Sequence, residues 1–417
     1  MRNWAGNVSY AAAEVAHPTS VGDVQRIVAQ ARRVRAVGTG HSFNRIADTT
    51  GTLLSASRLP RVVDVDSEAR TVRVSAGLRY GDIGHVLRNE GLALPNTGSL
   101  PHISIAGAVA TATHGSGAGN RILSSGVRSL TLVTATGDLV TADRESRPDD
   151  FDGWLVALGR LGVVVELVLD LVPDFEVAQT VVEDVDEGLL AEELTSVLAS
   201  AYGVSVFADW RGGRATQVWV KEQVGRDGGW DGAPLWGGRA ADGPRHPIPG
   251  MPVEHATVQM GQAGPWNERL PHFRLDFMPS SGDELQSEFW VAARHASDAW
   301  TALSGLRDRI APVLQILEVR AIAADPCWLS PTRGEPTVAF HLTWVSDADA
   351  VRAAVTALES ELTVFDVRPH WGKVFVTTPA RLAELYPRLP DFRRLVAELD
   401  PAAKLGNELV DGWLGLD

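Results

Sequence analysis

Four polar side chains in the second half of the chain have types and spacing that suit acid–base chemistry. Glu318 and Arg320 are separated by one apolar residue, and so are His341 and Thr343. Because side chains alternate across a β-strand, each pair lies on one face of its strand. If the two strands pair, a carboxylate, a guanidinium, an imidazole and a hydroxyl meet in one polar patch. The alternative is a half-exposed sheet whose polar side faces water.

A second group of residues suits the binding of an anion and of a flat ligand. Gly38 to Ser42 follows an expected strand and offers backbone N–H groups on a tight turn, which can hold a phosphate. Phe43 stands where the dinucleotide fingerprint G-x-G-x-x-G has its last glycine, so binding in that mode is not favoured. Residues 94–119 are mostly small or hydroxyl-bearing, which lets a backbone approach a ligand closely. A packed helix followed by a flexible loop explains that run equally well.

Several common catalytic motifs are absent from the sequence. It holds no G-x-x-x-x-G-K-[ST] phosphate loop, no H-E-x-x-H zinc helix and no G-x-S-x-G nucleophile elbow, which disfavours kinases, zinc peptidases and serine hydrolases. The single cysteine, Cys327, can make neither an internal disulfide nor a thiolate zinc site. No metal site is therefore expected.

Charge and hydropathy restrict the partners and the location. The 417 residues carry a net charge of −14, which disfavours nucleic acid and anionic membrane surfaces. No apolar stretch of signal-peptide length follows the N-terminus. The most apolar segment, 161–172, is interrupted by Glu166 and Asp170 and is shorter than the ~20 apolar residues that span a membrane. We expect a cytoplasmic protein that does not enter membranes.

The first 175 residues predict an α+β domain. Ser20 and Asp23 form a capping-box pattern at the start of a helix whose apolar residues share one face. Gly91 is suited to end a second helix over 80–90. The expected strands are 34–37, 53–54, 62–63, 72–74, the hairpin 130–133 with 139–141, and 162–171.

Residues 176–370 predict a second α+β domain, and 371–417 are expected to return to the first. Within the second domain, 211–249 is rich in Gly, Trp and Arg and is interpreted as a long surface excursion. The expected strands are 204–210, 216–221, 272–277, 314–321 and 338–344, and the expected helices are 296–310 and 347–362.

These motifs together resemble one family. Four segments of the first half are similar to the flavin domain of the vanillyl-alcohol oxidase family. They are His17-Pro18-Thr19-Ser20 and the runs 36–44, 99–107 and 113–117. Within it the similarity is to the alditol oxidase branch, which is related to the sugar-lactone oxidases. That branch's substrate domain is matched by the runs 265–266, 268–274, 328–331 and 368–373. The resemblance covers essentially the whole chain and implies an FAD-binding domain of two α+β subdomains with a cap domain built on a large antiparallel sheet.

The resemblance implies FAD held by the first domain and the C-terminal segment. The histidine after Gly-x-Gly, His41, would be bonded covalently to the flavin. A single link is expected because Cys327 lies outside the flavin motifs. The cofactor-binding residues that it implies are Gly38, Thr39, Gly40, His41, Ser42, Ser99, Ser104, Gly107, Thr111, Ala112, Thr113, His114 and Val163.

It also implies a polyol substrate, bound by Ser99, Glu318, Arg320, His341, Thr343 and Lys373. The terminal primary hydroxyl of a xylitol- or sorbitol-type polyol would become an aldehyde as hydride moves to flavin N5, and O2 would become H2O2. Arg320 and Lys373 would stabilise the alkoxide, and Lys373, Arg320 or His341 would take the proton. Without the resemblance, the sequence around Lys373 predicts an ordinary surface lysine.

Three further expectations complete this interpretation. Gly98 precedes Ser99 and leaves space for oxygen, which favours an oxidase. A sugar-lactone or other carbohydrate oxidase or dehydrogenase on the same scaffold is the alternative, and a flavin- or sugar-binding protein without turnover is a more distant one. The expected partners are a small-molecule polyol and O2, and the chain is expected to be a monomer.

Overall fold

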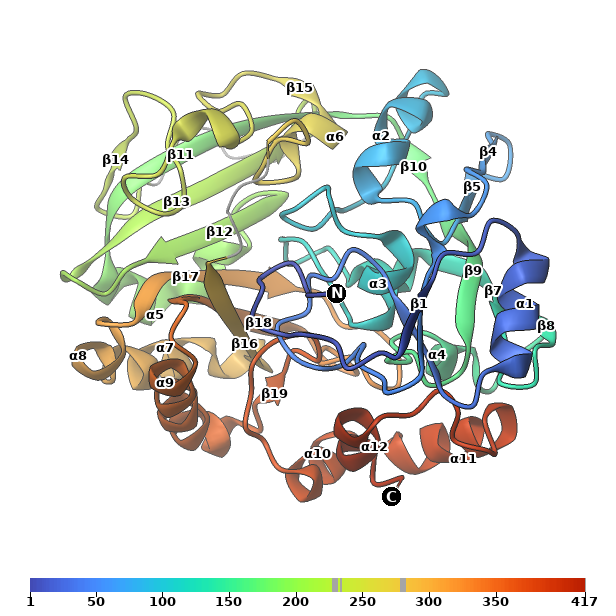
Figure 1. Ribbon diagram of the computed structural model, residues 1–417. Coiled ribbons are helices and arrows are strands. Elements are labelled where there is room, and N and C mark those ends of the chain that lie inside the picture. Colours follow the sequence, from blue (N-terminus) through green and yellow to red (C-terminus); the bar gives the residue numbers. More distant parts are fainter. Residues whose placement is uncertain (227–231, 233–234, 278–282, 417) are drawn as a thin grey trace.

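The computed structural model describes residues 1–226, 232, 235–277 and 283–416. A nine-stranded antiparallel sheet organises the second half of the chain (Figure 1). In spatial order its strands are β14 (Arg239–Ala240), β11 (Glu176–Asp186), β13 (Arg214–Gln223), β12 (Gly203–Ala208), β17 (Leu314–Ile322), β18 (Thr337–Val345), β16 (Glu284–Ala292) and β19 (Arg368–Pro369), with β15 (Gly264–Pro265) paired to β11.

The register of this sheet brings the predicted polar residues together. β17 and β18 pair antiparallel, with Glu318 opposite His341 and Ile316 opposite Thr343. On the other side of β18, β16 places Glu288 opposite His341. Three neighbouring strands therefore contribute to one polar face, as the alternation in two of them predicts.

The opposite face of the sheet is apolar and is covered by helices (Figure 1). Residues such as Leu317 and Phe340 pack there against Leu190, Trp300 and Val355 of the helices. Removal of this apolar surface from water is the main term that holds the layers together. The covering helices are α5 (Glu187–Leu198), α7 (Ala296–Ser304), α8 (Arg307–Ile310) and α9 (Ala348–Leu362).

The first half of the chain contains two further main sheets. One is antiparallel, in the order β4 (Val63–Asp66), β5 (Thr71–Ser75), β9 (Val163–Asp170), β7 (Val127–Val133) and β8 (Leu139–Asp143). The other is parallel, in the order β1 (Glu14–Ala16), β3 (Thr52–Ser55) and β2 (Val34–Val37). A short pair joins β6 (Leu92–Ala93) and β10 (Val172–Pro173). The predicted α+β class, with a large antiparallel sheet in the second half, is confirmed.

Local sequence signals set the helices of this half. The Ser20 hydroxyl accepts a hydrogen bond from Asp23 N at 3.0 Å and so caps the first helix. Gly91, with φ of +68°, follows the end of the second helix in the left-handed conformation that glycine adopts without strain. The helices are α1 (Val21–Gln30), α2 (Tyr80–Asn89), α3 (Ile105–Ala110) and α4 (Phe151–Trp154).

The C-terminal helices pack on the first half of the chain (Figure 1). Lys404 donates to the carbonyl oxygens of Val28 and Ala29 at 3.1 and 3.0 Å. Asp411 pairs with Arg160 at 2.8 Å. These helices are α10 (Pro379–Leu385), α11 (Leu389–Leu399) and α12 (Glu408–Leu414), while α6 (Trp266–Arg269) lies earlier in the chain. The domain boundaries at residues 175 and 370 remain predictions.

Three expectations for the second half are wrong. Residues 272–277 form no strand, because the backbone N–H groups of His272 and Phe273 both point to the carbonyl of Ser99. The segment 211–249 is not simply a surface excursion, because it contains β13, an interior strand of the large sheet, and the buried side chain of Trp236. Residues 227–231 and 233–234 of this segment lie outside the described residues. The helix expected over 296–310 is divided into α7 and α8. β11 and β16 were not predicted.

Candidate active site

A cavity of about 370 Å³ lies between the glycine-rich segments of the first half and the polar face of the large sheet. Most of the predicted site residues line it. These are Gly38, Thr39, Gly40, His41, Ser42, Gly98, Ser99, Ser104, Gly107, Thr111, Thr113, His114, Val163, Glu318, Arg320, His341, Thr343 and Lys373. Ala112 is the exception, because its side chain points into the hydrophobic core from a left-handed backbone position with φ of +60°.

Glu288 of β16 is a buried carboxylate that joins three cationic or imidazole groups. Its Oε1 lies 2.7 Å from His114 Nε2 and 3.2 Å from an Nη of Arg320, and its Oε2 lies 2.8 Å from Lys373 Nζ. Burial opposes ionisation, but Lys373, His114 and Arg320 outweigh it and hold the pKa of Glu288 well below the usual range. Glu288 is therefore an anion that fixes both cations of the cavity.

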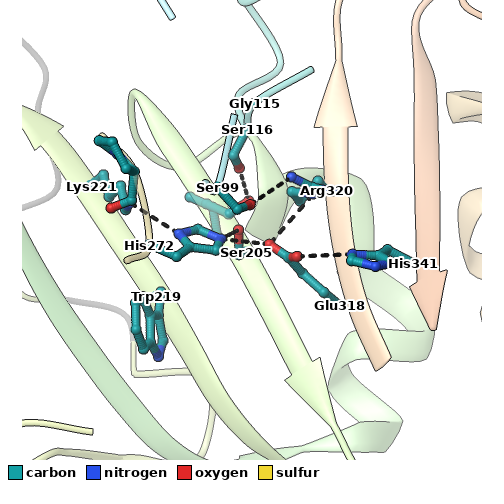
Figure 2. Close-up of polar contacts among 12 residues, drawn as sticks. Ser99, Gly115, Ser116, Ser205, Trp219, Lys221, His272, Glu318, Arg320 and His341 are labelled. Atoms are coloured by element: carbon teal, nitrogen blue, oxygen red, sulfur yellow. Dashed lines mark hydrogen bonds and ion pairs between the residues drawn. The ribbon is translucent and has the colours of Figure 1, made fainter. Parts of the chain in front are cut away.

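Glu318 of β17 is the second buried carboxylate. His272 Nε2 lies 2.7 Å from its Oε1, Arg320 Nε lies 3.4 Å from the same oxygen, and His341 Nδ1 lies 3.3 Å from its Oε2 (Figure 2). Burial again opposes ionisation, and Arg320 and His272 outweigh it, so the pKa of Glu318 is well below its usual range. The two carboxylates together hold Arg320 from both sides.

Arg320 and Lys373 provide positive charge at the cavity wall. Arg320 Nη1 also donates to the hydroxyl of Ser99 at 3.2 Å, which ties the sheet to the first half of the chain. Burial lowers the pKa of Lys373, and the charge of Glu288 opposes that shift. Both cations are thus placed beside anions but face the same cavity.

The tautomer of His341 follows from its neighbour. Nδ1 faces the carboxylate of Glu318, which only accepts hydrogen bonds, so Nδ1 carries the ring proton. Nε2 has no hydrogen-bond partner within the described residues. Burial, helped by the charge of Lys373, lowers the pKa of His341 to about 4, so the ring is neutral near pH 7 with an unprotonated Nε2.

The other wall of the cavity fits a flat cofactor with an anionic part. A Cβ on Gly38 would overlap the hydroxyl of Ser104, so the backbone approaches there as only glycine allows. Gly40 has φ of +74° and lies in the same turn. This turn exposes backbone N–H groups of the kind that hold a pyrophosphate. The donor set therefore fits FAD.

His41 lies at the edge of this turn. Its ring stacks on Trp4 with centroids 5.0 Å apart, and its Nδ1 lies 3.0 Å from Thr39 Oγ1. Burial, with a smaller contribution from His102, lowers the pKa of His41 to about 4. The ring is thus neutral and keeps a nitrogen lone pair, as a nucleophile requires.

Three functional candidates were missed by sequence reasoning: Glu288, His272 and Lys221. A signal existed for Glu288, because Glu284, Gln286 and Glu288 alternate as the residues of the other two strands do. His272 lies in the matched run 268–274, but no pattern in the sequence marks it as a partner of Glu318. Lys221 carries no sequence signal beyond its place in an apolar strand.

Comparison with known proteins gives the class. Residues 12–143 match the family model described as FAD binding domain, and residues 285–413 match the model described as D-arabinono-1,4-lactone oxidase. The second match contains Glu288, Glu318, Arg320 and His341. The fold and this cavity thus define an FAD-linked oxidoreductase.

Individual relatives narrow the assignment. The chain is 48% identical to an alditol oxidase of a Streptomyces species, over 98% of this chain and 99% of that one. It is 30% identical to the L-gulono-1,4-lactone dehydrogenase of Mycobacterium tuberculosis, over 99% and 98% of the two chains. The chain belongs to the alditol oxidase family of vanillyl-alcohol-oxidase-type FAD enzymes. The predicted resemblance is confirmed.

Structural comparison supports the fold alone. The crystal structure of cholesterol oxidase from B. sterolicum superposes with a TM-score of 0.81 at 15% identity, over 99% of this chain and 96% of that one. Within the described residues, no helix is long and apolar enough to cross a membrane.

Proposed function

We propose that the chain is an alditol oxidase, which converts the terminal primary hydroxyl of an acyclic polyol to an aldehyde while O2 becomes H2O2. Xylitol and sorbitol represent the substrate class. FAD, when bound, supplies the acceptor for the hydride that leaves the substrate carbon. The observation that carries the proposal is the arrangement of polar groups in rows across the large sheet.

The first row crosses three strands as Glu288, His341 and Glu318. The next row holds Gln286 and Thr343, two residues further along their strands and thus about 6.6–6.8 Å away. An extended polyol lying along the strands meets hydrogen-bonding groups at its reacting end and again towards its other end. A site built this way strongly rejects alcohols that lack the extra hydroxyls.

Arg320 and Lys373 stabilise the negative charge that develops on the reacting oxygen. Both are held by carboxylates before any substrate arrives, so their positive charge costs no rearrangement during the reaction. The hydroxyl of Ser99, already bonded to Arg320, faces the same end of the cavity.

His341 is the proton acceptor in this proposal. Its Nε2 is unprotonated at neutral pH and lacks a partner among the described residues, whereas Lys373 is engaged as a cation by Glu288. A neutral imidazole with a free nitrogen can take a hydroxyl proton. Since its pKa is about 4, the base remains available throughout the neutral range.

The test is to mix the purified flavoprotein with xylitol or sorbitol in air and to follow flavin absorbance and H2O2 together. Bleaching followed by peroxide supports the proposal. Reduction by aldonolactones but not by polyols would make the chain a lactone oxidase, a candidate favoured by the match of residues 285–413. Bleaching without peroxide would make it a dehydrogenase.

The proposed covalent link to FAD rests on His41 beside the pyrophosphate turn. His41→Ala is expected to release all of its flavin into the supernatant after acid precipitation, whereas the wild type keeps its flavin in the pellet. His17→Ala is the matched control, since His17 is exposed and does not line the cavity. Yellow colour retained in the His41→Ala pellet would rule out this link.

The proposed oxygen access rests on Gly98. A Cβ at this position would lie 3.3 Å from Ile103 Cδ1 and 3.5 Å from Thr113 Cγ2, so a larger side chain fills the space beside the cavity. Gly98→Val is expected to slow reoxidation of the reduced flavin by O2 more than it slows reduction by xylitol. Separate stopped-flow measurements of the two steps check this, and the opposite order would refute it. The monomeric state and cytoplasmic location remain predictions.

A further inference from the structure

The sequence contains three lysines, and one of them lies beside the candidate active site, two strands away from Glu318 in the large sheet. Lys221 of β13 is 3% exposed and does not line the cavity. It stands at one end of a series of contacts that runs through His272 and Glu318 to His341 (Figure 2). Neither the motifs nor the proposed reaction accounts for a buried amine at this place.

The ammonium group of Lys221 has three acceptors for its three protons. It donates to the carbonyl oxygen of Leu270, to that of Pro271 at 3.0 Å and to His272 Nδ1 at 3.1 Å. Because Nδ1 accepts, the ring proton of His272 stands on Nε2. That nitrogen lies 2.7 Å from Glu318 Oε1, closer than the 3.4 Å to the hydroxyl of Ser205.

The charge of Lys221 affects the protonation of His272, which lies between Lys221 and Glu318. The carboxylate of Glu318 favours a second proton on the imidazole of His272, and an imidazolium would offset the charge of Glu318. Burial lowers the pKa of Lys221 to about 7, although the charge of Glu318 opposes that shift. Below that pH the protonated amine beside Nδ1 opposes protonation of the ring. Burial first and Lys221 second lower the pKa of His272 to about 4. Glu318 then keeps its full charge for Arg320 and His341.

We propose that Lys221 is a positioning residue for the reaction, which holds His272 neutral with its proton on Nε2 so that Glu318 remains a full anion facing Arg320 and His341. The inference rests on the proposed polyol oxidation for its kinetic consequence. The simpler alternative is that Lys221 only fastens the 270–271 loop by its two carbonyl contacts.

The kinetic test replaces Lys221 with methionine in the complete flavoprotein. Residues that orient the ligands of metal sites typically contribute about 10–100-fold to activity, and we expect a slowing of that order for anaerobic reduction by xylitol. Reoxidation by O2 and flavin content are expected to stay unchanged. Lys404→Met is the matched control, because Lys404 Nζ has three acceptors as Lys221 does, but all three are backbone carbonyls and the residue does not line the cavity.

A double-mutant cycle separates positioning from loop fastening. His272→Phe keeps the edge-to-face packing with Phe207 and Trp219 but removes the ring nitrogens. If Lys221 acts through His272, then Lys221→Met in the His272→Phe background changes the reduction rate by less than about threefold, since coupled residues are not additive. An undiminished effect in that background would show that Lys221 acts structurally and would overturn the proposal.

A measurement without substrate distinguishes failure of this inference from failure of the proposed function. In protein labelled with ¹⁵N-histidine, the ring of His272 is titrated, and its signal is assigned by its loss in His272→Phe. In the wild type it is expected to be neutral with its proton on Nε2 at pH 6, where Lys221 is mostly protonated. In Lys221→Met the pKa of the ring is expected to rise, because the charge of Lys221 is removed while burial remains. The same His272 pKa in both proteins would overturn the proposal, whatever the enzyme oxidises.

Discussion

Lys373→Met is expected to slow flavin reduction by xylitol by about 10²–10³-fold, the usual effect of removing one preorganised group that stabilises a developing oxyanion. Lys373 Nζ is held 2.8 Å from Glu288 and lines the cavity beside Arg320. Methionine keeps most of the length of the side chain and removes the charge. Anaerobic stopped-flow spectroscopy measures the rate, with saturation by xylitol separating binding from the chemical step.

The control for this substitution is again Lys404→Met, which removes a lysine whose amine donates to three backbone carbonyls. The flavin of Lys404→Met is expected to be reduced by xylitol at the wild-type rate. Near-normal reduction in Lys373→Met would remove this residue from the mechanism and leave the oxyanion to Arg320 alone. A rise in the half-saturating xylitol concentration with an unchanged limiting rate would make Lys373 a binding group.

Glu288→Gln is expected to impair both stability and reduction. Breaking a buried ion pair by removing one partner typically costs about 3–5 kcal/mol, because the remaining charges are buried without compensation. Here Lys373 and Arg320 would both lose their shared anion. The expected results are a lower thermal midpoint of the holoprotein and slower reduction by xylitol.

Glu359→Gln is the matched control for Glu288→Gln. Glu359 is also a buried carboxylate, but it accepts hydrogen bonds from Val376 N and Thr377 Oγ1 at 2.6 Å and lies away from the cavity. Its substitution is expected to leave the reduction rate unchanged. If Glu288→Gln kept both the wild-type midpoint and the wild-type rate, the two cations would not depend on this carboxylate.

The alternation of polar and apolar residues was sufficient to predict two strands of the site and their shared face. It failed for β16, although Glu284, Gln286 and Glu288 alternate there. The reason is Ser287, a fully buried hydroxyl on the apolar face that accepts a hydrogen bond from the indole of Trp344 at 3.1 Å. A serine on the apolar face interrupts the alternation of polar and apolar residues. The strand was therefore not predicted, and neither was Glu288, the carboxylate that binds Arg320 and Lys373.

Other parts of the site depend on contacts between segments distant in sequence. His272 faces Glu318 because its loop is held by the carbonyl of Ser99 and by Lys221, which are 173 and 51 positions away in the chain. No local pattern encodes such contacts, so 272–277 was predicted as a strand. The family resemblance indicated the cofactor and the substrate class, but it did not indicate which groups orient the catalytic residues.

The three lysines have a practical consequence for chemical labelling. The other 35 of the 38 basic residues are arginines, whose guanidinium groups do not react with amine-directed acylating reagents. Lys221 is buried and the nitrogen of Lys404 is engaged by three carbonyls, whereas Lys373 faces the cavity. Burial lowers the pKa of Lys373, although its ion pair with Glu288 opposes that shift. A small acylating reagent that enters the cavity should therefore react with the unprotonated fraction of Lys373, in competition with the polyol. Peptide mass spectrometry of the peptide that contains Lys373 would give the fraction of protein left unacylated. That fraction measures how much of the protein has polyol bound, without using the absorbance of the flavin.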